Sequence, residues 1–148
     1  MKLYIDADGC PVTRIAAERA RAYGIPVTLV CDCAHLFEIE GTETVTVTKG
    51  ADSADFRLVN LIRRGDIAVT QDYGLAAMCL ARGAYVLDQN GREYTSENID
   101  SLLAARHFAK KQRAAGARLK GPSKRTGSQD TAFLKALEDL FTRARSDR

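Results

Sequence analysis

The sequence predicts an α/β fold built on a mostly parallel sheet of five strands. Short apolar or β-branched segments alternate along the chain with longer stretches in which apolar residues recur at helical spacing. Glycines follow several of the helical stretches directly, as expected where a helix ends. Strands that alternate with helices form mostly parallel sheets with right-handed crossovers. Such sheets bind ligands beyond the carboxyl ends of their strands, where the strand order changes direction.

The expected strands are short and rich in Val, Ile, Leu and Thr, which suits a buried or half-buried sheet. The first begins just after Met1 and ends in acidic residues. Asn90-Gly91 is a strong signal for a hairpin turn, and it leads into a short extended segment at 92–94. The strands are predicted at residues 3–7, 25–30, 44–48, 67–70 and 84–87.

The first expected helix begins near Pro11, a residue favoured at the first helical position, and ends at Gly24. The second ends at Gly65, and its apolar residues Phe56, Val59 and Ile62 are expected to face the core. Ser96 is expected to cap the fourth helix. The second to fifth helices are predicted at residues 52–64, 75–82, 96 to about 112, and around 133–141.

The charges divide the 148 residues unevenly. Residues 1–100 carry 10 basic and 15 acidic side chains, a net charge of −5, whereas residues 101–129 carry eight basic side chains and no acid. We therefore expect an α/β domain at 1–112, followed at 113–148 by a basic linker and an amphipathic C-terminal helix. A basic segment beside an acidic body fits an enzyme that binds a polyanion, although a solvated tail has the same composition.

Composition argues against a membrane or secreted protein. The chain has no apolar run near the roughly 20 residues that a membrane helix needs. Because the N-terminal residues enter a strand at once, we expect no signal peptide. The four cysteines lack the spacing of a disulfide framework, so a reduced, cytoplasmic chain is expected. The sequence does not predict an oligomeric state.

Five aspartates follow the ends of three predicted strands. Asp6 and Asp8 follow the first strand, Asp52 and Asp55 the third, and Asp72 the fourth. If the first and fourth strands flank the change in strand order, these carboxylates crowd one edge of the sheet, where they require protons, basic partners or a bound cation. Hard oxygen ligands favour Mg²⁺ or Mn²⁺, and a metal held in this way can activate water for attack on a phosphoryl group.

Each acid also has a purely structural interpretation. Asp52 and Asp55 stand where carboxylates stabilise a helix N-terminus, and Asp72 could cap a loop. Asp6 is harder to explain in this way, because a strand carboxylate among apolar neighbours is costly without a partner. Asp66 precedes its strand, so it is expected at the opposite edge in a structural role.

Several stretches resemble the bacterial YaiI/YqxD family, and the likeness covers nearly the whole chain. They are Tyr4-Ile-Asp-Ala-Asp-Gly-Cys-Pro-Val12, Gly50-Ala-Asp-Ser-Ala-Asp55, Gly65-Asp-Ile-Ala-Val-Thr-Gln-Asp-Tyr73, Tyr94-Thr-Ser-Glu-Asn-Ile-Asp100 and Lys120-Gly-Pro122. That family is similar to PIN and NYN domains, which are metal-dependent ribonucleases. The resemblance implies a PIN-like three-layer α/β/α fold, to which this chain adds a basic helical C-terminal extension.

The resemblance also implies a site. Asp6, Asp52 and Asp72 match the catalytic aspartates of PIN-like nucleases, with Asp8 and Asp55 as further metal ligands. The expected partner is nucleic acid, RNA before DNA, and the expected cofactor is Mg²⁺ or Mn²⁺. Basic residues are expected to contact the phosphate backbone. They are Lys49, Arg106, Lys110, Lys111, Arg113, Arg118, Lys120, Lys124 and Arg125.

Two other functions stay open. Asp6-Ala-Asp8-Gly9 partly matches the start of haloacid-dehalogenase-type phosphatases, in which the first acid is a nucleophile and the second a general acid. Cys10 and the position of Gly65-Asp66 depart from that pattern. The remaining alternative is a PIN-like module that binds RNA without cleaving it.

Overall fold

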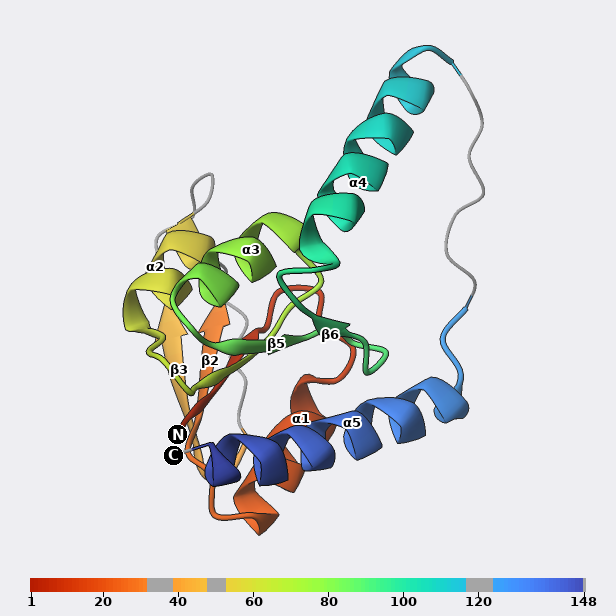
Figure 1. Cartoon of the computed structure of the whole chain (residues 1–148). Coiled ribbons are helices and arrows are strands. Elements are labelled where there is room, and N and C mark those ends of the chain that lie inside the picture. The colour runs from red at the N-terminus through yellow and green to blue at the C-terminus, as the bar shows by residue number, and fades with distance from the viewer. Residues whose placement is uncertain (32–38, 48–52, 117–123, 148) are drawn as a thin grey trace.

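The computed structural model of the chain describes residues 1–31, 39–47, 53–116 and 124–147. A single sheet has the strand order β3-β2-β1-β4-β5-β6 (Figure 1). Neighbouring strands from β3 to β5 are parallel, and β6 is antiparallel to β5. The strands are β1 (Leu3–Asp6), β2 (Val27–Cys31), β3 (Thr42–Thr46), β4 (Ile67–Val69), β5 (Tyr85–Leu87) and β6 (Glu93–Tyr94).

The sheet in the described part of the chain has six strands, where the sequence predicts five. The additional strand is the segment after Asn90-Gly91, which folds back so that Val86 pairs with Tyr94 and Leu87 with Glu93. Gly91 has a φ of +89°, a value that a turn of this kind needs and that other residues rarely adopt. The predicted hairpin is therefore confirmed, and it adds an edge strand to the sheet.

Helices cover both faces of the sheet (Figure 1). On one face, α1 and α5 enclose a core that includes Leu3, Ile5, Phe133 and Phe141. On the other face, α2, α3 and the start of α4 enclose a second core around Tyr94 and its neighbours. The helices are α1 (Thr13–Ala22), α2 (Ser53–Leu61), α3 (Tyr73–Ala81), α4 (Ile99–Ala114) and α5 (Gly127–Ser146).

The C-terminal helix α5 belongs to the packed body of the protein. Phe133, Leu137, Leu140 and Phe141 are all buried, at the i, i+4, i+7 and i+8 spacing of one helix face. This face contacts α1 and the strand residues beneath it. By contrast, α4 buries only its first residue, Ile99, and then extends away from the body (Figure 1).

Two local expectations are corrected. Phe56 is 59% exposed rather than inward, because Leu58 and Ile62 set the buried face of α2 and Phe56 lies on the far side of the helix. Ser96 does not cap α4, which begins at Ile99 after Asn98. The preceding turn is closed instead by Thr95 and Asn98, whose side chains each accept a hydrogen bond from the other's backbone N–H.

No helix in the described ranges is long and apolar enough to cross a membrane.

Candidate functional site

The strand order changes direction between β1 and β4. From β1 the chain adds β2 and β3 on one side, and then β4, β5 and β6 on the other. Asp6 is the last residue of β1, and Asp72 lies just beyond β4, immediately before α3. Because β1 and β4 are parallel neighbours, both residues lie at the carboxyl edge of the sheet, at its switch point.

A buried hydroxyl joins the two aspartates. Thr70, which is 1% exposed, donates its hydroxyl to Asp6 Oδ2 at 2.8 Å. The same oxygen accepts the backbone N–H of Asp72 at 3.0 Å. Thr70 therefore fixes the carboxylate of Asp6 relative to the start of α3. The sequence placed all three residues near this edge and did not predict the link between them.

A second hydrogen bond crosses the same switch point. Gln71 Nε2 donates to the carbonyl oxygen of Gly9 at 2.9 Å, so the loop after β4 is tied to the loop after β1. Asp8 is half-buried on the loop after β1, next to Gly9. The carboxylates of Asp6 and Asp72 are thus held between two loops that are linked to each other.

Asp72 also has the structural role that the sequence left open. Its Oδ1 accepts the backbone N–H groups of Gly74 at 2.8 Å and Leu75 at 3.2 Å, which caps the N-terminus of α3. The same oxygen contacts Arg106 Nη1 at 3.5 Å. Asp72 is therefore both a helix cap and the partner of a basic side chain that arrives from α4.

The other predicted ligands are less fully placed. Asp55 falls in the first turn of α2, with its side chain outside what the structure describes, and Asp52 and Lys49 lie outside the described residues. Among the residues that are described, no group of three or more His, Cys, Asp or Glu is arranged to hold a metal ion. Within this part of the chain, the structure brings together Asp6 and Asp72, with Asp8 on the adjoining loop.

Asp66 lies at the opposite edge of the sheet, as expected. Its carboxylate accepts the backbone N–H of Lys2 and that of Arg63, both at 2.9 Å, and its side chain is buried. These bonds fix the start of β4 against the N-terminal segment. Asp66 is therefore structural.

Cys10 lies on the loop beside the candidate site and was not among the predicted site residues. Burial raises the pKa of its thiol, a hydrogen bond with Thr13 opposes that rise, and the nearby charge of Asp6 adds to it. A thiol with a raised pKa stays protonated near neutral pH and is a poor nucleophile. We therefore assign Cys10 to packing of the loop.

The sequence matches, over residues 4–143, a family model described as an uncharacterized YaiI/YqxD family. The chain belongs to the YaiI/YqxD family. It is 51% identical over 142 residues to a UPF0178 protein of Exiguobacterium sibiricum, covering 96% of this chain and 97% of that one. It is 46% identical to a UPF0178 protein of Clostridium acetobutylicum, covering 98% and 99% of the two chains. No solved structure matches the chain.

The family match includes both halves of the candidate site. Asp6, Thr70, Asp72 and Arg106 all fall between residues 4 and 143, as does most of α5. The predicted YaiI/YqxD resemblance is therefore confirmed along nearly the whole chain.

The basic residues of this YaiI/YqxD chain occupy different environments. Arg106, Lys110, Lys111 and Arg113 are exposed on α4, and Lys124 is exposed before α5. Arg125 is instead engaged by the protein: it donates to Asp130 Oδ1 at 2.7 Å, Asn90 Oδ1 at 2.8 Å and the Gln89 carbonyl oxygen at 2.7 Å. Arg118 and Lys120 lie outside the described residues.

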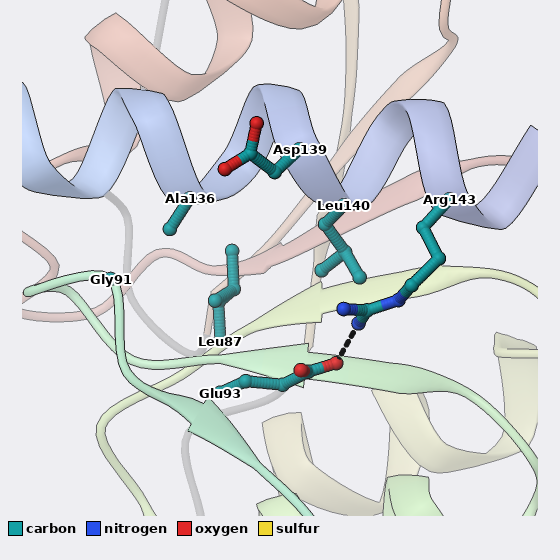
Figure 2. Close-up of a pocket in the computed structure, with 7 residues that line it drawn as sticks. All are labelled: Leu87, Gly91, Glu93, Ala136, Asp139, Leu140 and Arg143. Carbon is teal, nitrogen blue, oxygen red and sulfur yellow. Dashed lines mark hydrogen bonds and ion pairs between the residues drawn. The ribbon is translucent and has the colours of Figure 1, made fainter.

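A cavity of about 170 Å³ lies away from the aspartates, where α5 crosses the hairpin of β5 and β6 (Figure 2). Arg143 spans it from α5 to form an ion pair with Glu93, and its guanidinium lies 5.5 Å from the centre of the Tyr85 ring. The cavity is lined by Leu87, Gly91, Glu93, Ala136, Asp139, Leu140 and Arg143. In this YaiI/YqxD chain it marks the contact between α5 and the hairpin.

Proposed function

We propose that this YaiI/YqxD chain is a divalent-metal-dependent nuclease that hydrolyses phosphodiester bonds at the carboxyl edge of its sheet. The observation that carries the proposal is the arrangement at the switch point. There, Thr70 donates its hydroxyl to the carboxylate of Asp6 at 2.8 Å and accepts the backbone N–H of Asp72 at 3.0 Å. Half-buried aspartates fixed at this edge of a parallel sheet are typical of a ligand site rather than of core packing.

The fold supports a PIN-like assignment within the proposal. Helices pack on both faces of a mostly parallel sheet, as in a three-layer α/β/α arrangement. The acids follow β1 and β4, the two strands on either side of the switch point. In this proposal, residues 1–112 form the PIN-like domain, and the basic linker and helix α5 within 113–148 form its C-terminal extension.

The donor set fits Mg²⁺ or Mn²⁺. Carboxylate oxygens are the hard ligands that these ions prefer, and two or three carboxylates with water complete their coordination. Asp6 and Asp72 would hold the ion, with Asp8, Asp52 and Asp55 as the further ligands that the sequence predicts. When bound, the ion supplies charge stabilisation at a phosphoryl oxygen and lowers the pKa of a coordinated water.

The protein's own residues have separable roles. Thr70 holds Asp6 in one orientation through its hydroxyl. The backbone N–H groups of Gly74 and Leu75 hold Asp72. Arg106, whose guanidinium already contacts Asp72, is placed to neutralise a phosphate beside the carboxylates.

The proposed substrate is nucleic acid, RNA before DNA, and the proposed compartment is the cytoplasm. The support is the segment 101–129, which carries eight basic side chains and no acid. Several of these cations lie on α4, and one of them, Arg106, contacts Asp72 at the candidate site. Contacts of this kind bind the phosphate backbone without reading bases.

The deciding experiment incubates purified protein with labelled single- and double-stranded RNA and DNA, with Mn²⁺, Mg²⁺ or chelator. We expect cleavage of RNA that requires metal and that is lost in Asp6→Asn and Asp72→Asn. Cleavage that survives both substitutions, or no cleavage with either metal, would overturn the proposal.

A non-catalytic RNA-binding module is the second candidate. It is favoured by one observation: the Asp72 carboxylate accepts two backbone N–H groups at the start of α3 and contacts Arg106, which is a sufficient structural role. Such a module would bind RNA equally well in chelator and would never cleave it. The phosphatase alternative has weaker support, because Gly65-Asp66 stands at the opposite edge of the sheet, bonded to backbone. Trapping a phosphorylated Asp6 would favour the phosphatase over the nuclease.

A further inference from the structure

One face of α4 runs from the core of the protein into solvent. Ile99 is buried in the core and Leu103 packs against it. Arg106, Lys110 and Arg113 continue the same line at alternating spacings of four and three residues, which place side chains above one another on a helix. We call Arg106, Lys110 and Arg113 the α4 ridge. Because the apolar end of this face is anchored in the body, the ridge has a fixed direction relative to the sheet.

The ridge begins at the candidate site. Arg106 Nη1 lies 3.5 Å from Asp72 Oδ1, and the side chains of the two residues are 60% and 36% exposed. An ion pair this open to water is held weakly, so its partners can exchange for other charges. Lys110 and Arg113 are also exposed and have no acidic neighbour in their own segment, since residues 101–129 contain no Asp or Glu.

The size of the ridge suits a single phosphate backbone. Arg106 and Arg113 are seven residues apart, which corresponds to about 10 Å along a helix. Consecutive phosphates of one strand are separated by roughly 3.4 Å or more along its axis, so three side chains can follow successive phosphates. The ridge is one helix wide and ends at half-buried carboxylates, which a single strand can reach more easily than a duplex.

We propose that the α4 ridge is the surface along which a single nucleic-acid strand enters the candidate site, and that Arg106 exchanges Asp72 for a backbone phosphate when the strand binds. The inference rests on the proposed function for what happens at the carboxylates. Strand binding along the ridge itself requires no metal, so the two ideas can fail separately.

The proposal gives Arg106 two effects of opposite sign. As a contact to phosphate, it strengthens strand binding. As a cation beside Asp72, it opposes a metal ion at the same carboxylate. Replacing Arg106 with Gln therefore weakens binding of the strand and strengthens binding of metal. A residue that only supported the fold would weaken both.

Strand binding is measured by fluorescence anisotropy of a labelled single-stranded oligouridylate in chelator. The variants are Arg106→Gln, Lys110→Gln, Arg113→Gln and the triple substitution. The matched control is Lys135→Gln, which removes the same charge from an exposed helix position on α5, away from the ridge. We expect the triple variant to bind about 10- to 100-fold more weakly. The slope of log affinity against log salt should become shallower by about 2, because each of the three phosphate contacts on a single strand contributes about 0.7. Lys135→Gln should change affinity by less than about threefold.

Three results of this experiment would overturn the proposal. One is an effect of Lys135→Gln on affinity as large as that of any ridge substitution. Another is an unchanged salt slope in the triple variant. The third is equal affinity for a duplex of the same length, which would exclude a single-strand path.

Metal binding is measured separately, by titrating each variant with Mn²⁺ in the absence of nucleic acid. We expect Arg106→Gln to bind Mn²⁺ roughly fivefold more tightly, from loss of about 1 kcal/mol of charge repulsion near the surface, with Lys135→Gln unchanged. If the wild-type protein binds no Mn²⁺ and the ridge variants still bind the strand more weakly than the wild type, the nuclease proposal is refuted and the ridge proposal stands. Weaker Mn²⁺ binding in Arg106→Gln would refute the exchange.

Discussion

Thr70 donates its hydroxyl to the carboxylate of Asp6 at 2.8 Å, across the junction of β1 and β4. The two residues are 64 positions apart in the chain, and the bond connects the halves of the sheet on either side of its switch point. Thr70 is almost fully buried, so its hydroxyl cannot easily exchange Asp6 for water. The geometry of the candidate site therefore depends on a neutral residue that carries none of its proposed chemistry.

Thr70→Val tests this dependence. The substitution keeps the shape of the side chain but removes the donor to Asp6 and the acceptor for the Asp72 N–H. We expect the free energy of unfolding in urea to fall by about 1–3 kcal/mol, because partly buried polar groups lose their partner. Thr70→Ser keeps the hydroxyl, so its free energy of unfolding should fall clearly less than that of Thr70→Val. Equal losses in the two variants would assign the effect to packing alone.

Substitutions of Asp72 separate its capping role from its proposed metal role. Asn caps a helix about as well as Asp, so Asp72→Asn should keep the stability of the wild type, whereas Asp72→Ala should lose about 1 kcal/mol. Both variants remove the charged metal ligand. RNA cleavage should therefore fall about 100-fold or more in each, since metal assistance contributes several kcal/mol to catalysis. Unchanged cleavage by Asp72→Asn would leave Asp72 as a cap only.

The stability of the protein should fall at alkaline pH through Tyr94. Burial raises the pKa of Tyr94 far above its usual value, and the charge of Asp88 adds to this rise. The folded chain thus keeps the phenol proton after the unfolded chain has released it. The contribution of Tyr94 is complete below the unfolded pKa, near 10, and is lost as pH rises from there through the folded pKa.

Tyr94→Phe removes the titrating group and keeps the ring, which packs edge-on against Tyr73 with 5.8 Å between centroids. In urea unfolding, the variant should lose less stability than the wild type between neutral pH and pH values above about 10. Tyr23→Phe, on the other face of the sheet, is the control. If Tyr23→Phe reduces the alkaline loss of stability as much as Tyr94→Phe does, the ionisation of Tyr94 is not the cause of that loss.

Arg125 should behave as a structural residue although it lies in the basic segment. It bonds to Asp130, Asn90 and the Gln89 carbonyl oxygen, and its side chain is 23% exposed. Arg125→Gln should reduce the free energy of unfolding by about 1–3 kcal/mol, the range for charge-assisted hydrogen bonds of a partly buried side chain. Its exposed neighbour provides the control Lys124→Gln, which should be neutral. No difference in stability between the two variants would return Arg125 to the group of proposed phosphate contacts.

The local parts of the fold were predictable because their signals are local. The alternation of short apolar segments with helical periodicity located every strand of the parallel sheet, and Asn90-Gly91 located the hairpin. The position of Asp66 before its strand was enough to place it at the opposite edge. Placement of Asp6 and Asp72 at one edge followed from the rule that parallel strands share a carboxyl edge.

The remaining features depend on how elements meet. The sequence gives no sign that Arg106 lies beside Asp72, since the angle at which α4 leaves the sheet decides that contact. Phe56 was assigned to the core together with Val59 and Ile62 on their apolar spacing, but Leu58 and Ile62 determine which side of α2 is buried. The apolar spacing of Phe133, Leu137 and Leu140 predicted an amphipathic helix without indicating which surface it would cover.

The position of α5 has a consequence for synthesis of the protein. Leu3 and Ile5 leave the ribosome well before Phe133 and Phe141, the residues with which they share a core. At about 5–20 residues per second, that partner helix follows on the order of ten seconds later. During this interval, the part of this sheet face that α5 later covers stays apolar and exposed, as a surface for holding chaperones or for aggregation. A translation product that ends before Gly127 would keep that surface permanently, and quality control should remove it.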